Sequence, residues 1–133
     1  MKTRSREWVA ERSLREGAGR GRLVVRLAKA YEVAETEWVC HIEIRRGRRR
    51  IEVDVRGYDS FQAMILALRV IRKELDKLGS SIEWEGGESG DTGFPLYVTD
   101  LFGLELTRRL EAIVESETER FLAERKPRAP ADR

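Results

Sequence analysis

Apolar and polar residues alternate along the first half of the chain, as in strands that have one buried face. The pattern predicts strands at about residues 8–15, 23–28, 38–44 and 51–56, and a later short strand at 81–85. The clearest strand places these residues on one face: Trp38, Cys40, Ile42 and Ile44. Polar connections such as residues 32–36 separate the strands, so we expect an antiparallel meander with one buried and one hydrated face.

Helical spacing replaces the alternation after Gly57. Asp59 is the predicted N-cap, Gln62 can bond back to the amide of the cap, and Gly79 ends the helix. The residues expected to cover the sheet are Phe61, Met64, Ile65, Leu68, Ile71, Leu75 and Leu78. A second apolar strip lies on nearly the opposite side of the helix and contains Ala63, Leu66, Ala67 and Val70. A helix that is apolar on two sides should be covered twice. Leu66 and Val70 are therefore candidate contacts for the C-terminal helix or for a second copy in a homodimer.

A second helix is predicted from about residue 100 to residue 126. Its apolar stripe contains Leu106, Leu110, Ile113, Val114 and Phe121, and Glu117 interrupts it. Four glycines indicate a flexible loop at 86–93, and residues 127–133 are expected to form a disordered tail. The predicted fold class is α+β: an antiparallel sheet of about five strands covered by one long helix, plus a long C-terminal helix. We expect a single domain over residues 1–126.

Five short segments of the chain resemble a known family when they are taken together. They are Trp38-Val39-Cys40, Gly57-Tyr58-Asp59-Ser60-Phe61-Gln62-Ala63, Ala67-Leu68, Trp84 and Gly93-Phe94-Pro95. Over about residues 10–95 the sequence resembles a family of small bacterial domains of unknown function. The Gly-x-Asp-Ser-x-Gln-Ala element at the helix start is the most specific part. The resemblance implies a bacterial origin and this α+β layout, and it brings no activity or site residues.

Charge is divided unevenly along the chain. Residues 1–56 carry 15 Lys+Arg and 9 Asp+Glu, a net +6, whereas residues 57–133 carry 11 and 15, a net −4. Such a dipolar chain is not typical of a general nucleic-acid-binding protein. Cys40 is the single cysteine, which excludes an intrachain disulfide and suits a reducing compartment. The chain has no apolar run long enough for a membrane span, so we expect a cytoplasmic protein.

Five arginines flank one predicted turn, and they are Arg45, Arg46, Arg48, Arg49 and Arg50. Guanidinium groups at a hairpin tip suit phosphate or carboxylate groups, although a solvated turn has the same composition. No aromatic residue lies between them, so stacking on nucleic-acid bases is not supported. A second charged segment lacks basic residues and contains Glu83, Glu85, Glu88 and Asp91. It is either a surface for a basic partner or a solvated loop.

His41, Glu43, Glu52 and Asp54 should share the hydrated face of two neighbouring strands. An imidazole and three carboxylates could ligate a metal ion or transfer protons. Alternation places polar residues outside in any case, however, and nothing in the sequence indicates a cleft that excludes water. Cys40 faces the core beside Trp38, so burial is expected rather than nucleophilic chemistry. We therefore expect no catalytic residue, no metal ligand and no cofactor.

These observations favour a non-enzymatic protein-interaction module, for which an immunity- or antitoxin-like role is one form. The expected partner-binding residues are the five arginines and the four acidic residues. The alternative is a nucleic-acid-associated protein that uses the basic hairpin at 45–50. A metal-dependent enzyme centred on His41 is a third possibility.

Overall fold

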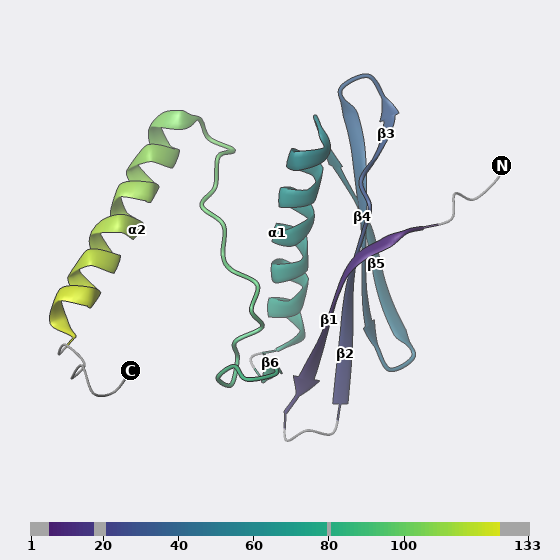
Figure 1. The fold of residues 1–133 in the computed structure, drawn as a ribbon, viewed down its shortest axis with the longest axis horizontal. Helices are drawn as coiled ribbons and strands as arrows, with labels where there is room; N and C mark the ends of the chain where they lie inside the picture. Colours follow the sequence, from purple (N-terminus) through teal and green to yellow (C-terminus); the bar gives the residue numbers. More distant parts are fainter. Residues whose placement is uncertain (1–5, 18–20, 80, 126–133) are drawn as a thin grey trace, which may run out of the picture. The chain divides into compact units, whose positions relative to one another are not determined.

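The computed structural model describes residues 6–17, 21–79 and 81–125. The chain forms two units, Met1–Leu96 and Tyr97–Arg133, which are described separately. The architecture is α+β, as the sequence predicts: an open antiparallel sheet, a helix after the sheet and a C-terminal helix (Figure 1). A single domain over residues 1–126 stays a prediction. The predicted tail, residues 127–133, lies outside the described residues.

The sheet is built around a central strand that pairs along both of its sides. The strands are β1 (Trp8–Glu16), β2 (Gly21–Ala28), β3 (Tyr31–Ala34), β4 (Glu37–Arg46), β5 (Arg49–Gly57) and β6 (Ile82–Trp84). β5 pairs with one side of β4, while β2 and β3 share its other side. β1 then lies beside β2, and β6 pairs with β1 at the far edge. The predicted strands are confirmed, but β3 occupies part of the stretch that we expected to be a connection.

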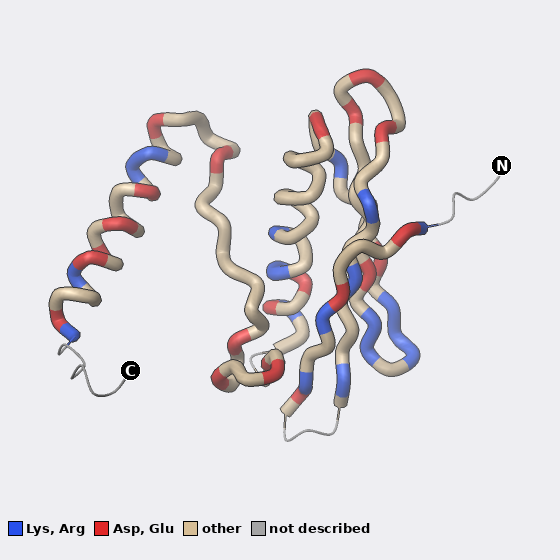
Figure 2. Tube along the Cα trace, viewed as in Figure 1, with Lys and Arg blue, Asp and Glu red and all other residues tan. Residues whose placement is uncertain are grey.

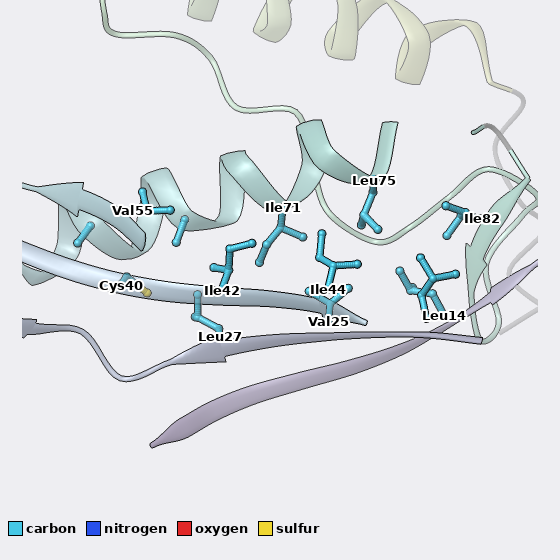
Figure 3. Packing of buried hydrophobic residues seen from close by; sticks show 13 residues of the cluster. Leu14, Val25, Leu27, Cys40, Ile42, Ile44, Val55, Ile71, Leu75 and Ile82 are labelled. Carbon is cyan, nitrogen blue, oxygen red and sulfur yellow. The ribbon is translucent and has the colours of Figure 1, made fainter. Parts of the chain in front are cut away.

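The hydrophobic core lies between one face of this sheet and helix α1 (Ser60–Leu78). Figure 3 shows Ile42 and Ile44 of β4 below Ile71 and Leu75 of α1. These four side chains are 0–1% exposed. Full burial of an Ile or Leu side chain contributes about 1.5–3 kcal/mol, so this layer is a main source of stability. Cys40 is 0% exposed in the same layer, which confirms its predicted burial.

The helix face that meets the sheet differs in part from the prediction. Ile71 and Leu75 are buried as expected, but Phe61 is 79% exposed and Ile65 is 49% exposed. Ala63 and Ala67, which we assigned to the opposite strip, are 0% exposed against the sheet. The physical reason is the close approach of the helix to the sheet, which leaves room for methyl groups but not for an aromatic ring.

The start of α1 has a capping box with one difference from the expected bonding. Asp59 is the N-cap, and its Oδ1 accepts a hydrogen bond from the Gln62 amide at 2.8 Å. The Gln62 side chain bonds back to the amide of Tyr58 at 2.6 Å, rather than to that of Asp59. A cap of this kind contributes about 1 kcal/mol to helix stability. Gly79 follows the helix at φ 131°, a conformation that favours glycine.

The second unit contains helix α2 (Leu104–Glu124). The Thr107 hydroxyl donates to the Thr99 carbonyl at 2.9 Å and so ties the first turn to the preceding segment. No residue of α2 is buried, and Ile113, Val114 and Phe121 of the predicted stripe are 53–58% exposed. Neither α1 nor α2 is long and apolar enough to cross a membrane.

We predict that Gly57→Ala destabilises the protein by about 3 kcal/mol, because overpacking of this kind forces backbone to move. A Cβ at Gly57 would lie 2.3 Å from the Ala63 nitrogen and 2.7 Å from the Ala63 Cα. Gly47→Ala is the matched control: its φ is +60°, but a Cβ would meet nothing within 4 Å. That change should cost only about 1 kcal/mol. Urea unfolding measures both values, and equal losses would contradict the close approach of α1.

Candidate functional site

The face of the sheet turned away from α1, called the outer face below, carries charged side chains in rows across the strands. Glu52, Glu43 and Arg26 stand opposite one another on β5, β4 and β2. One row nearer the β4–β5 turn, Arg50 stands opposite Arg45. A carboxylate row therefore borders an arginine row. The outer face therefore carries both signs of charge in neighbouring rows.

The five arginines of the β4–β5 turn, called the arginine hairpin below, differ in their pairing. Arg46 pairs with Glu16, while Arg45 and Arg50 lie 3.5 and 3.6 Å from the Glu43 carboxylate. Arg48 and Arg49 are exposed, and no acidic side chain of the described residues pairs with either. Figure 2 shows the basic residues gathered along this turn. Among the described residues, the hairpin thus presents two cations without an acidic partner beside three that share the carboxylates of Glu16 and Glu43.

The structure places the four residues of the predicted acidic surface in different surroundings. Glu83 lies 3.8 Å from Arg15, so its charge is partly neutralised by β1. Asp91 accepts a hydrogen bond from the Gly93 amide, and its carbonyl accepts one from the Trp84 amide. These bonds tie the segment that we expected to be flexible back to β6. Glu85 and Glu88 remain exposed.

His41 is buried, although we expected it on a hydrated face. Its Nδ1 lies 2.5 Å from Asp54 Oδ1, and its Nε2 lies 3.4 Å from Glu52 Oε1. The Trp8 ring covers it at a centroid distance of 5.9 Å. The His41 side chain is only 4% exposed as a result. Both ring nitrogens face carboxylates, so neither is free to act as a general base towards a substrate.

Glu43 is a second buried polar group of the outer face, at 3% exposure. It lies under the guanidinium groups of Arg45 and Arg50, yet its Oε1 has no hydrogen bond. Arg26, the residue opposite on β2, also has a buried Nε without a hydrogen-bond partner. A buried carboxylate costs free energy unless it is paired, and here the pairing is by charge at long distance. The outer face is therefore hydrated at its rim but not at its centre.

The strands are irregular beside His41. Leu27 pairs with Ile42 and Tyr31 pairs with Val39, so the three residues at the break between β2 and β3 stand opposite two of β4. The register of β1 also shifts beside this point, between Trp8 and Ala10. A pocket of about 370 Å³ lies here, lined in part by Arg6, Lys29, Tyr31, Trp38 and His41. Register shifts like that of β1 often occur beside binding sites because they redirect side chains.

The proposed dimer contacts, Leu66 and Val70, are partly buried and pack against the core cluster. The apolar side chains that α1 exposes instead are Phe61 and Ile65, next to Tyr58 at 65% exposure. The homodimer stays a prediction.

Sequence reasoning brought His41, Glu52 and Asp54 together correctly, but it missed the burial of His41. It also missed the acidic β3–β4 turn, where Glu32, Glu35 and Glu37 lie (Figure 2). Trp8 could have indicated the burial of His41, because an aromatic side chain on the polar face of a strand can cover side chains of the neighbouring strands. In the part of the chain that the structure describes, no group of His, Cys, Asp and Glu is arranged to hold a metal ion.

Comparison with known proteins gives a family but no activity. A family model described as a domain of unknown function (DUF6968) matches residues 10–96. No curated protein and no solved structure matches the chain. The match covers more than half of the chain, including α1 and all of the sheet except Trp8 and Val9 at the start of β1. The chain therefore belongs to the DUF6968 family.

We predict that ionisation of the Cys40 thiol lowers the stability of the folded protein at high pH. Burial raises the pKa of the Cys40 thiol from 9.0 to about 11, and its Sγ donates to the Ala28 carbonyl at 3.3 Å. Because the unfolded thiol ionises first, its contribution is intact below pH 9.0 and is lost as the pH rises towards about 11. The expected slope is at most about 1.4 kcal/mol per pH unit.

Urea unfolding of the wild type and of Cys40→Ala at each pH isolates the thiol, because all other titrating groups are common to both proteins. A stability difference that stays constant across this pH range would contradict the prediction.

Proposed function

We propose that this member of the DUF6968 family is a non-enzymatic protein-interaction module that binds an acidic protein surface through its arginine hairpin. The observation that carries the proposal is the unequal pairing within the hairpin. Arg46 pairs with Glu16, and Arg45 and Arg50 share the single carboxylate of Glu43, whereas Arg48 and Arg49 are exposed without an acidic partner among the described residues. The paired arginines hold the turn in place, so the two free guanidinium groups have less freedom to lose on binding.

The surroundings of the hairpin favour a protein partner over a nucleic acid. Guanidinium groups bind carboxylates through two parallel hydrogen bonds, which a compact acidic patch can accept. A phosphate backbone is longer, and along the outer face it would meet the carboxylate of Glu52. Residues 45–50 also contain no aromatic side chain on which a base could stack. Steering by opposite charge would speed the encounter with an acidic partner.

The proposal also includes a cellular compartment and a second, acidic contact surface. An immunity- or antitoxin-like inhibitor in the bacterial cytoplasm is one form of such a module, by analogy of size and charge pattern. A single buried thiol, Cys40, suits a reducing compartment. Glu85 and Glu88 remain available to a basic patch, since no basic side chain of the described residues pairs with them.

We predict that Arg48→Glu/Arg49→Glu weakens binding of a fluorescein-labelled polyglutamate peptide by about tenfold or more at low salt. The loss should appear mainly as slower association, and wild-type binding should weaken steeply as salt rises. Arg108→Glu/Arg109→Glu on α2 is the matched control, because it changes the net charge equally at exposed positions of the other unit. Stopped-flow fluorescence and anisotropy titration measure both variants.

Equal weakening by the two variants would show that net charge, and not the hairpin, governs binding. Tighter binding to random duplex or single-stranded oligonucleotides than to the peptide would favour the nucleic-acid alternative. Either result would overturn the proposed function.

A further inference from the structure

We propose that the pocket beside His41 binds a small zwitterion with an aromatic side chain, of the class of the free aromatic amino acids. This site lies outside the arginine hairpin and is independent of the proposed partner binding. Its walls combine two cations, two carboxylates and two aromatic rings: Arg6, Lys29, Glu7, Glu32, Tyr31 and Trp38. A ligand that carries one positive group, one negative group and one ring matches this lining.

The irregular strands create the space. Ala28, Lys29 and Ala30 lie at the break between β2 and β3, opposite only Cys40 and His41, and the Lys29 amide donates to the Glu7 carbonyl instead of to β4. Ala28 and Ala30, which line the pocket, fill little of the gap. The resulting volume, about 370 Å³, lies at the lower end of the range of about 300–1,000 Å³ that is usual for ligand pockets. It suits a molecule of amino-acid size.

One ion pair of the pocket is firm, and the other is loose. Arg6 Nη1 lies 2.8 Å from Glu52 Oε1, and Glu52 in turn contacts His41, so this side of the pocket is fixed. Lys29 Nζ lies 3.8 Å from Glu7 Oε2, with the two side chains 68% and 71% exposed. Exposed pairs at this distance contribute little to stability, so a ligand separates them at small cost.

The loose pair sets the expected orientation of the ligand. The ligand carboxylate takes the place of Glu7 at Lys29, and the ligand ammonium takes the place of Lys29 at Glu7. Charge-assisted hydrogen bonds replace a long contact, and the ring is left to pack beside Tyr31 and Trp38. A ligand with one charge leaves either Lys29 or Glu7 without its partner, so both charges are required for full affinity.

Isothermal titration calorimetry with three probes of similar ring size tests this inference: L-tryptophan, tryptamine and indole-3-propionate. We expect L-tryptophan to bind about tenfold or more tightly than the two singly charged probes. Lys29→Ala and Glu7→Ala should each weaken L-tryptophan binding about tenfold, because each removes one charged contact. Lys73→Ala and Glu115→Ala are matched controls at exposed positions outside the pocket, and they should leave binding unchanged.

Three results would overturn the inference. The first is no saturable binding of L-tryptophan up to its solubility limit. The second is equal or tighter binding of tryptamine or indole-3-propionate, which would assign the pocket to a single charge. The third is equal affinity for L-tryptophan in the pocket variants and in the controls. Because these variants leave Arg48 and Arg49 intact, polyglutamate binding should persist in them whatever the outcome.

Discussion

The close approach of α1 to the β4–β5 hairpin is the contact on which the rest of the first unit depends. Gly57 has no side chain, and its Cα lies against the backbone of Ala63. The next turns of the helix present Ala67 and then Ile71 to the sheet at 0–1% exposure. With the helix seated on β4 and β5, the inner face of both strands becomes core, and their charged residues are confined to the outer face.

Ionisable side chains of three strands are therefore brought together on the outer face. Glu43 and Glu52 form a carboxylate row, which is bordered by the arginines of the hairpin on one side and by His41 on the other. Trp8 covers the centre of this face and removes water from His41. Burying a polar group costs free energy unless it has partners. His41 and Glu43 therefore indicate a network of fixed polar contacts at the centre of this face. The carboxylate of Glu43 holds Arg45 and Arg50 in position, and that of Glu52 holds Arg6.

Two sites of different character result from this arrangement. The arginine hairpin, the proposed partner surface, projects Arg48 and Arg49 into solvent, and no acidic side chain of the described residues pairs with either. The pocket beside His41 is recessed and lined by both signs of charge, and it is suited to a small molecule. Both proposed sites involve the central strand β4: its turn carries the arginines, and the pocket lies where its pairing passes from β2 to β3.

The amino-acid sequence determined the elements of this fold, because alternation along β4, the Asp59 cap and the helical spacing up to Leu78 are local patterns. It also determined that His41, Glu52 and Asp54 share a face, since strand parity and a short turn leave no other pairing. Tertiary structure alone decided which side of α1 meets the sheet, because Phe61 and Ala63 both belong to apolar strips and only the clearance at Gly57 separates them. It likewise decided the burial of His41 and the pocket beside it. Both depend on Trp8 of β1 and on Lys29 of the connection between β2 and β3, which are distant from His41 in the sequence and which only the pairing of the strands brings beside it.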